Sequence, residues 1–457
     1  MVMANKQVGA IDARLAPGPQ GNYFLGSLPE LKRKGPLKLY LEGWQKYGDI
    51  VRFRMGPLVQ HLIVRPEHVR QVLVSNKENY CKGIGYSKVK LLLGTGLFVS
   101  EGTLWRQQRR LMQPPFTAKA VPQFAEAITA STQQLLQRWH HYAEKGESIG
   151  LNQEMMRLAM NIIARVMFSI DVDSSAIAVG RAITEALAFI SARPTTIFDV
   201  PLFIPTTKNR RFKAALRILD QFLTETIEHH RKDQHRDLLS LLLSARDEER
   251  GQTMTEEQLR YEIMTIFLAG HETTAQALTW AWYLLSCHPE SENRLHTELD
   301  TNVSGRDVTV ADLPSIPYTR MVMEETMRLY PPVWIFPRDA VADEEIGGYH
   351  IPKGSMVLLC QYITHRHPEF WKDPEIFEPM RFQAELSKDR PDQAYYPFGA
   401  GTRTCLGNHF AMLESQLVLA TIAQHYRLSM LPGQQVQPKV VGTLRPAQEI
   451  RMMLHTR

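Results

Sequence analysis

The sequence predicts a mainly α-helical protein with small β-sheets, and three observations support this fold class. Helical periodicity dominates from about residue 67 to residue 328. Short runs typical of strands lie on either side of this stretch, near residues 49–64 and 331–365. One apolar helical segment of about 30 residues, about 45 Å at 1.5 Å per residue, is long enough to cross the middle of the protein.

Composition and charge exclude several classes of protein. With 457 residues, of which 44% are hydrophobic and 22% charged, the chain is ordinary for a globular protein. The net charge of +5 comes without a basic block, so we expect no nucleic-acid partner, although a weakly positive surface suits an acidic protein. No segment resembles a secretory signal or approaches the roughly 18–20 apolar residues that span a bilayer. We therefore expect a cytoplasmic protein with no membrane anchor.

Domain boundaries and structural cysteine pairs are not evident in the chain. No linker, repeat or low-complexity run interrupts it, which favours a single domain over residues 1–457. Cys81, Cys287, Cys360 and Cys405 are far apart and form no C-x-x-C pair. This spacing argues against a zinc cage or a disulfide framework and fits a reducing compartment.

The strand-like runs are bounded by turn residues. The segment PGPQGNYFLGSLPEL (17–31) is rich in Pro and Gly and predicts an irregular strap. DIVRFRMGPLVQHLIV (49–64) alternates in hydropathy and breaks at Gly56-Pro57, which predicts a hairpin. EIGGYHIPKGSMVLLC (345–360) predicts a second hairpin-like run after Pro331.

The long helix has clear start and stop signals. Thr255 is the expected N-cap, with Gln258 reaching back as the second half of a capping box. Apolar residues then dominate as far as Cys287, and Pro289 is the expected stop.

The segment FGAGTRTCLG (398–407) places one cysteine in a glycine-rich turn before a helix expected from about Leu406 to His425. A thiolate is a soft ligand that suits iron, and glycines let the backbone approach a flat cofactor closely. Backbone N–H groups near a helix start stabilise negative charge on sulfur, and Arg403 could pair with an acidic cofactor edge. The alternative is a glycine-rich turn around a buried thiol.

The pattern F-x-x-G-x-R-x-C-x-G, without departure, resembles the haem-binding loop of cytochromes P450. The resemblance implies the P450 fold, a triangular helical prism with the long central helix over the haem. It also implies haem b as cofactor and Cys405 as the axial ligand of the haem iron. The loop residues implied to bind the cofactor are Phe398, Gly399, Arg403 and Gly407.

Within the long helix, AGHETT (269–274) places an acid and two hydroxyls in an apolar stretch. It resembles the family's [AG]-G-x-[DE]-T-[TS], which implies that Glu272 and Thr273 deliver protons during oxygen activation. Ala269 and Gly270 have almost no side chain, so a ligand could lie against the helix there. The alternative is a kink in which Thr273 bonds back to a carbonyl, and both can hold at once. His271 occupies the variable position of the motif, so we interpret it as structural.

Other motifs agree in order and spacing. ETMR (325–328) resembles the family's E-x-x-R, in which Glu325 and Arg328 share a helical face and pair with Arg381 of FEPMRF as a structural core. WRQQR (105–109) resembles the family's W-x-x-x-R, which implies that Trp105 and Arg109 meet a haem propionate. Arg338 is a further propionate candidate, by its distance past ETMR alone.

The resemblance covers nearly the whole chain and implies a soluble, bacterial-type monooxygenase without a fused reductase. The enzyme would use O2 and two electrons from NAD(P)H, delivered by a separate ferredoxin or flavodoxin with its reductase. Arg106 and Arg110 lie off the Arg109 face and are candidates for the docking surface. We expect a monomer. The alternatives are a peroxygenase or rearranging enzyme that needs no electron partner, which the Glu272–Thr273 pair argues against, and a non-catalytic haem sensor or carrier.

Family analogy places the substrate pocket between the loop before Trp105, segment 189–203, the long helix, the turn after ETMR and the chain's end. These mostly apolar positions favour a hydrophobic substrate such as a terpenoid, fatty acid or polyketide, which the enzyme would hydroxylate or epoxidise. The pocket candidates are Leu97, Phe98, Ile266, Ala269, Val333, Trp334, Ile335, Thr443 and Leu444.

Overall fold

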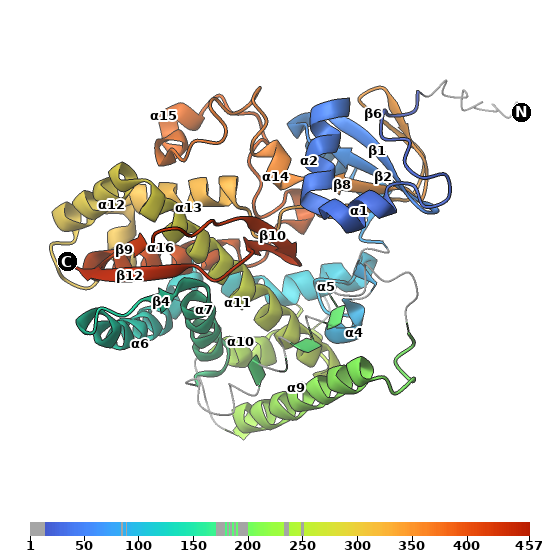
Figure 1. The fold of residues 1–457 in the computed structure, drawn as a ribbon. Coiled ribbons are helices and arrows are strands. Elements are labelled where there is room, and N and C mark those ends of the chain that lie inside the picture. The colour runs from blue at the N-terminus through green and yellow to red at the C-terminus, as the bar shows by residue number, and fades with distance from the viewer. Residues whose placement is uncertain are drawn as a thin grey trace, which may run out of the picture.

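In the computed structural model, a long helix, α11 (Glu256–Cys287), runs diagonally through the middle of the molecule (Figure 1). The structure describes residues 14–457 except 84–85, 88, 171–178, 181, 183–184, 187–188, 191–199, 233–236 and 248–250. Helices surround α11, and most of the strands gather in one part of the molecule with the N-terminus at its edge (Figure 1).

The ends of α11 follow from local sequence. The Thr255 hydroxyl accepts a hydrogen bond from the Gln258 amide at 3.2 Å, and Glu256 and Glu257 favour the positive end of the helix dipole. The predicted capping box is only half formed, because the Gln258 side chain accepts no hydrogen bond from the Thr255 amide in return. The helix ends at Cys287, and one residue, His288, separates it from α12, which begins with Pro289.

Most of α11 is buried because other helices cover it. The helix α7 (Leu151–Phe168) packs along it, and α13 (Pro317–Leu329) and α16 (Asn408–His425) contact it further on. These helices share one large hydrophobic cluster. The other α-helices whose bounds are given by the described residues are α1 Leu28–Lys34, α2 Pro36–Tyr47, α3 Pro66–Arg70, α4 Lys90–Leu93, α5 Gly102–Met112, α6 Ala125–Glu144, α9 Thr207–Lys232, α10 Leu238–Ser244, α12 Pro289–Asn302, α14 Gln361–Thr364 and α15 Ala384–Ser387.

A five-stranded sheet, in the order β1-β2-β8-β5-β3, joins distant parts of the chain. The predicted hairpin at 49–64 is confirmed as β1 (Ile50–Met55) and β2 (Leu58–Ile63), with Ile50 opposite Ile63. Strand β8 (Met356–Leu359) pairs parallel to β2 and antiparallel to β5 (Phe336–Ala340), which in turn pairs with β3 (Tyr80–Cys81).

Three smaller sheets complete the strands. Strands β6 (Glu344–Ile346) and β7 (Tyr349–Ile351) form a hairpin within the second predicted run. Strand β12 (Arg451–Thr456) lies between β4 (Ile149–Gly150) and β9 (Tyr426–Met430). The hairpin of β10 (Pro438–Val441) and β11 (Thr443–Pro446) lies against α11.

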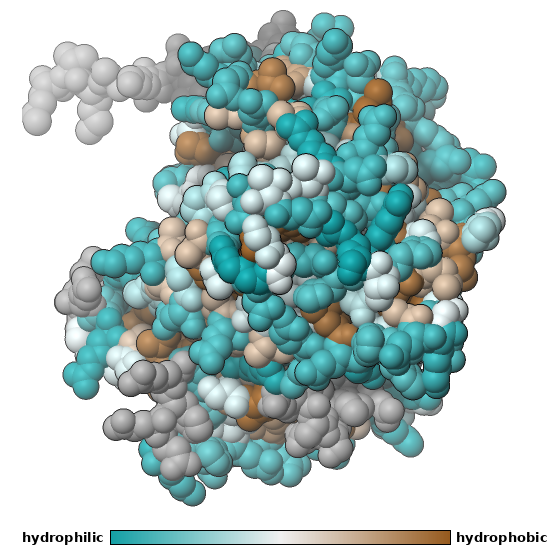
Figure 2. All heavy atoms as spheres, turned by 90° about the vertical axis from the view of Figure 1, so that its left-hand side faces the viewer, coloured by the Kyte–Doolittle hydropathy of each residue, from teal (hydrophilic) through white to brown (hydrophobic). Residues whose placement is uncertain are grey.

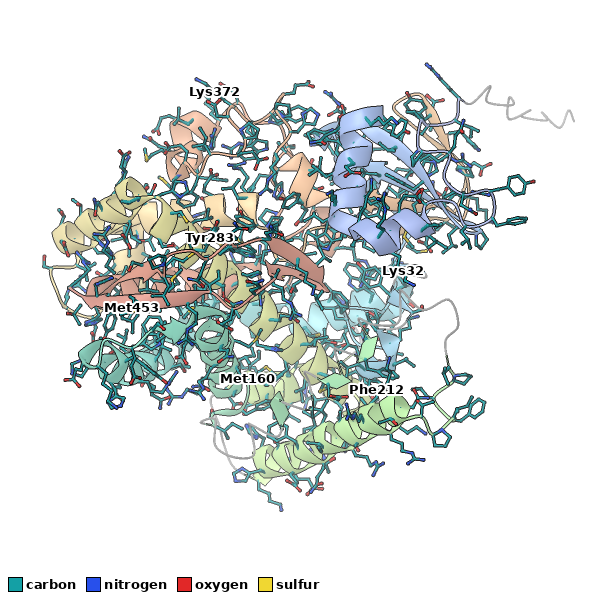
Figure 3. All side chains as sticks on the ribbon, in the orientation of Figure 1. Lys32, Met160, Phe212, Tyr283, Lys372 and Met453 are labelled. Carbon is teal, nitrogen blue, oxygen red and sulfur yellow. The ribbon has the colours of Figure 1, made fainter. Side chains whose placement is uncertain are left out.

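The surface is mainly polar where it can be seen in Figure 2, which shows mostly hydrophilic side chains with scattered hydrophobic ones. Within the core, Phe212 of α9 is fully buried and stacks on Phe189 with ring centroids 4.2 Å apart (Figure 3). Across the part of the chain that the structure describes, none of the helices combines the length and the hydropathy that a bilayer span requires.

Candidate active site

The loop that carries Cys405 depends on two glycines with left-handed backbone conformations. Gly399 has φ of 75° and Gly401 has φ of 67°. A Cβ atom on Gly401 would lie 2.2 Å from the carbonyl oxygen of Leu73, so a larger residue there would force the loop away from its neighbour. The Cys405 amide donates to the Phe398 carbonyl at 2.8 Å, which closes the turn and fixes the cysteine.

The Cys405 thiol faces accessible space although protein surrounds it. Cys405 is exposed to solvent-sized molecules. Nevertheless, the surrounding protein removes the thiol from bulk water, and this burial is the main reason why the pKa of Cys405 is raised. Both observations hold if the sulfur faces an enclosed space. The Gly407 N–H and the Arg109 guanidinium act in the opposite direction and lower the pKa of the thiol. The helix α16 begins at Asn408, two residues later than predicted, so Gly407 is its N-cap residue.

A second internal surface lies on α11. Ala269 is exposed and Gly270 and Thr273 are half-buried, whereas Phe267 and His271 are buried. Because α16, which follows Cys405 directly, packs against α11, both accessible surfaces lie on neighbouring elements. An accessible thiol and an accessible strip of small residues fit a flat cofactor between them.

The acid and the alcohol of AGHETT have different partners. The Thr273 hydroxyl donates back to the Ala269 carbonyl at 2.7 Å, as in the structural alternative. The half-buried Glu272 carboxylate accepts a hydrogen bond from Thr443 at 2.7 Å. His271 is buried and bonded to the Phe267 carbonyl at 2.8 Å, within its own helix.

Arginines from three segments gather beside the loop. Arg403 lies 3.9 Å above the Trp105 ring, donates to the Ser100 carbonyl at 3.0 Å and pairs with Glu101. Burial lowers the pKa of Arg403, Glu101 raises it in part, and the charges of Arg338 and Arg109 lower it, which places both of these arginines within electrostatic range of Arg403.

The other two arginines have backbone and hydroxyl partners. Arg109 donates to the Thr404 carbonyl at 2.9 Å. Arg338 is buried and donates to the Pro337 carbonyl at 2.8 Å and to the Tyr86 hydroxyl at 3.4 Å.

A fourth cation, Lys82, was missed by the sequence analysis. It is buried and donates to the carbonyls of Leu97, at 3.2 Å, and Phe98. Burial, together with the nearby charges of Arg403 and Arg338, lowers its pKa from 10.5 to about 7. A single lysine in the segment YCKG has no local pattern that could reveal this environment.

Three arginines and Lys82 lie beside two acids, the exposed Glu101 and the buried Glu262, whose pKa burial raises to about 7, so positive charge is in local excess. Buried like charges are unfavourable unless an anion joins them. The two carboxylates of haem b would supply such an anion, so the donor set fits the cofactor that the loop motif implies.

The motif residues Glu325 and Arg328 form a fully buried ion pair with distances of 2.6 and 2.8 Å. Arg328 also donates to three backbone carbonyls between residues 365 and 376. Arg381 approaches Glu325 at 3.4 Å. This network ties α13 to the segment that leads to the cysteine loop.

The structure separates the predicted pocket residues into three groups. Phe98, Val333, Ile335 and Thr443 are at least partly exposed, whereas Leu97 and Ile266 are buried, Ile266 about one turn before Ala269 on α11. Trp334 and Leu444 belong to a separate hydrophobic cluster beneath the five-stranded sheet, where Trp334 stacks on Tyr40. Most of segment 189–203 lies outside the described residues.

The family model described as "Cytochrome P450" matches residues 16–453. The chain belongs to the cytochrome P450 family. It is therefore a cytochrome P450 monooxygenase that uses haem b and O2, acts on a small molecule and receives electrons from a redox partner.

Several known P450 proteins resemble the chain over most of its length. It is 35% identical to "Cyclooctatin synthase" of Streptomyces melanosporofaciens, over 93% of this chain and 92% of the relative. It is 36% identical to "Cyclooctat-9-en-7-ol 5-monooxygenase" of the same organism, over 90% and 88%. The solved haem domain of cytochrome P450DA has a TM-score of 0.90 and 25% identity, covering 97% of this chain and 98% of that one, which confirms the predicted P450 fold.

Proposed function

We propose that this P450 hydroxylates or epoxidises a terpenoid. The observation that carries the proposal is the similarity to enzymes named for two terpenoids: cyclooctat-9-en-7-ol, and the pentalenene of "Pentalenene oxygenase" from Streptomyces avermitilis, which is 32% identical over 92% of each chain. The accessible apolar strip at Ala269 and Gly270 supports it, since a bulky hydrocarbon needs a wall without projecting side chains.

Each site residue has a proposed role. Cys405 ligates the iron, with Phe398, Gly399 and Gly407 shaping its loop and the Gly407 N–H stabilising the thiolate. Arg403, Arg338, Arg109 and Lys82, with Trp105, hold the carboxylate edge of the cofactor. A thiolate-ligated haem supplies the activation of dioxygen.

The protein's own contribution is proton supply and the exclusion of water. Glu272 relays protons that come from solvent, and the Thr273 hydroxyl, released from the Ala269 carbonyl, passes them on toward the dioxygen substrate. The Glu325–Arg328–Arg381 network is structural and holds the cysteine loop in place.

The proposal also covers the domain organisation, the oligomeric state, the location and the electron donor of the enzyme. The chain forms one haem domain, acts as a cytoplasmic monomer, and receives electrons from a ferredoxin or flavodoxin through a separate reductase. The family match over residues 16–453 supports the first point, and the net charge of +5 supports an acidic electron donor.

A ligand titration tests the substrate class. A library of terpenoids, fatty acids and polyketides is titrated into the haem-loaded protein, and the iron spin-state change is recorded for each. Terpenoids are expected to bind most tightly, and turnover with a generic ferredoxin and reductase should convert the best of them to an alcohol or epoxide. Tight binding and turnover of fatty acids, with no response to terpenoids, would overturn the proposal.

A further inference from the structure

The hydrogen bond that holds Glu272 comes from the far end of the chain. The Thr443 hydroxyl donates to Glu272 Oε1 at 2.7 Å, and the two residues are 171 positions apart. Thr443 is the first residue of β11, which forms a hairpin with β10 against α11 (Figure 1). A donor on a carboxylate is a charge-assisted contact, which has about twice the strength of a neutral one.

The backbone beside Thr443 is fixed from two sides. The Leu444 amide donates to the Pro332 carbonyl at 2.9 Å, and the Trp280 indole donates to the Leu444 carbonyl at 3.0 Å. Trp280 lies on α11 itself, is fully buried and stacks on Tyr330 with ring centroids 3.9 Å apart. Tyr283, one turn further along α11, is labelled in Figure 3.

This arrangement gives the hydroxyl of Thr443 a defined place relative to α11. Because Trp280 and Glu272 lie on the same helix, the hairpin is attached to α11 both at the tryptophan and at the acid. The Thr273 hydroxyl donates its hydrogen bond to the Ala269 carbonyl. The hydrogen bond that Glu272 accepts therefore comes from Thr443 of the hairpin.

We propose that Thr443 is the positioning residue for Glu272: its hydroxyl sets the orientation of the carboxylate from which protons reach the oxygen-activation site. The inference rests on the proposed role of Glu272 and adds a residue that the AGHETT motif does not contain. A merely structural hairpin contact would make the same hydrogen bond but would leave the fate of the electrons unchanged when the hydroxyl is removed.

The test compares four variants of the haem-loaded enzyme: Thr443→Val, Thr443→Ser, Glu272→Gln and the double variant Thr443→Val/Glu272→Gln. For each, product and hydrogen peroxide are measured per electron pair consumed, together with the solvent deuterium isotope effect on turnover. Substrate affinity comes from the spin-state titration. Thr443→Ala replaces Thr443→Val if the second methyl of valine prevents folding.

Thr443→Val is expected to raise the share of electrons lost to peroxide about two-fold or more and to enlarge the isotope effect, while Thr443→Ser stays close to the parent enzyme. The double variant should match Glu272→Gln alone, because the hydroxyl acts through the acid. A crystal structure of Thr443→Val should show Glu272 turned away from residue 443, with the Trp280–Leu444 hydrogen bond retained.

The possible failures are distinguishable. If Glu272→Gln leaves the coupling of electrons to product unchanged, the proposed role of Glu272 is wrong and the inference falls with it. If Glu272→Gln uncouples the enzyme and Thr443→Val does not, only the inference about Thr443 is overturned. If Thr443→Val still alters coupling or affinity in the Glu272→Gln background, Thr443 acts directly on the substrate, which also overturns the inference.

Discussion

Replacement of the buried Glu414 by glutamine should change how stability depends on pH. Glu414 lies on α16 and is 1% exposed, and the Thr274 hydroxyl of α11 donates to it at 3.3 Å. Burial raises the pKa of Glu414 from 4.5 to about 8, and the hydrogen bond lowers it only in part. The folded protein therefore keeps this carboxyl neutral at pH values where the unfolded chain has already ionised it.

The sign and size of the effect follow from the two pKa values. Because the folded pKa is above the unfolded one, the stability that this group contributes is fully present below pH 4.5 and is lost as the pH rises toward 8. Each pH unit in this window costs about 1.4 kcal/mol of unfolding free energy, and the whole window costs about 5 kcal/mol at most. Glutamine keeps the acceptor for Thr274 and does not ionise, so Glu414→Gln should abolish this slope.

Guanidinium unfolding of the haem-loaded parent and Glu414→Gln proteins, followed by circular dichroism at pH 5.5, 7 and 8.5, measures the difference. Between pH 5.5 and pH 8.5, the stability of the variant relative to the parent should rise by about 3 kcal/mol. Glu385→Gln, at an exposed glutamate of α15, is the control for the loss of one carboxyl. Parallel pH dependences of the parent and Glu414→Gln would refute the reasoning.

Two further predictions concern proton and electron supply. Thr273→Ala should still bind substrate and accept electrons, but a larger share of the electrons from reduced nicotinamide should reduce O2 to hydrogen peroxide without forming product; unchanged coupling would remove Thr273 from the mechanism. Arg106 is exposed, whereas Arg110 pairs with the buried Asp247 at 3.0 Å, so Arg106→Glu alone is the suitable test of the docking surface. It should slow first-electron transfer several-fold at low ionic strength and flatten its salt dependence, while Lys213→Glu on α9 should not; equal stopped-flow rates for both variants would argue against docking there.

Local signals in the sequence predicted much of the fold. The Thr255 N-cap and Pro289 delimit α11, and the turn at Gly56-Pro57 sets the first hairpin. The pairing of β2 with β8, nearly 300 residues later, was not predicted, because periodicity shows that a segment is a strand but not which strand it joins. The half-formed capping box has a similar cause, since the spacing of Thr255 and Gln258 does not show which partner the Gln258 side chain takes in the fold.

The candidate site likewise contains residues that the sequence predicted and residues that only the tertiary fold reveals. A motif of ten residues pointed to Cys405 and its glycines, because the constraints on that loop are local. Lys82 and the contact between Thr443 and Glu272 arise from segments brought together only by the tertiary fold. Single residues without spacing partners give no pattern in the sequence, so a three-dimensional structure was needed to find them.

The central claim, that Cys405 is the thiolate ligand of the haem, is tested most directly by the ferrous–CO absorption spectrum. Cys405→Ser should lose the red-shifted band that marks a thiolate-ligated haem. Cys360→Ser, at a fully buried thiol whose pKa burial raises to about 12, is the matched control and should keep the band wherever the protein folds. Retention of the band in Cys405→Ser, or its loss in folded Cys360→Ser, would contradict the assignment.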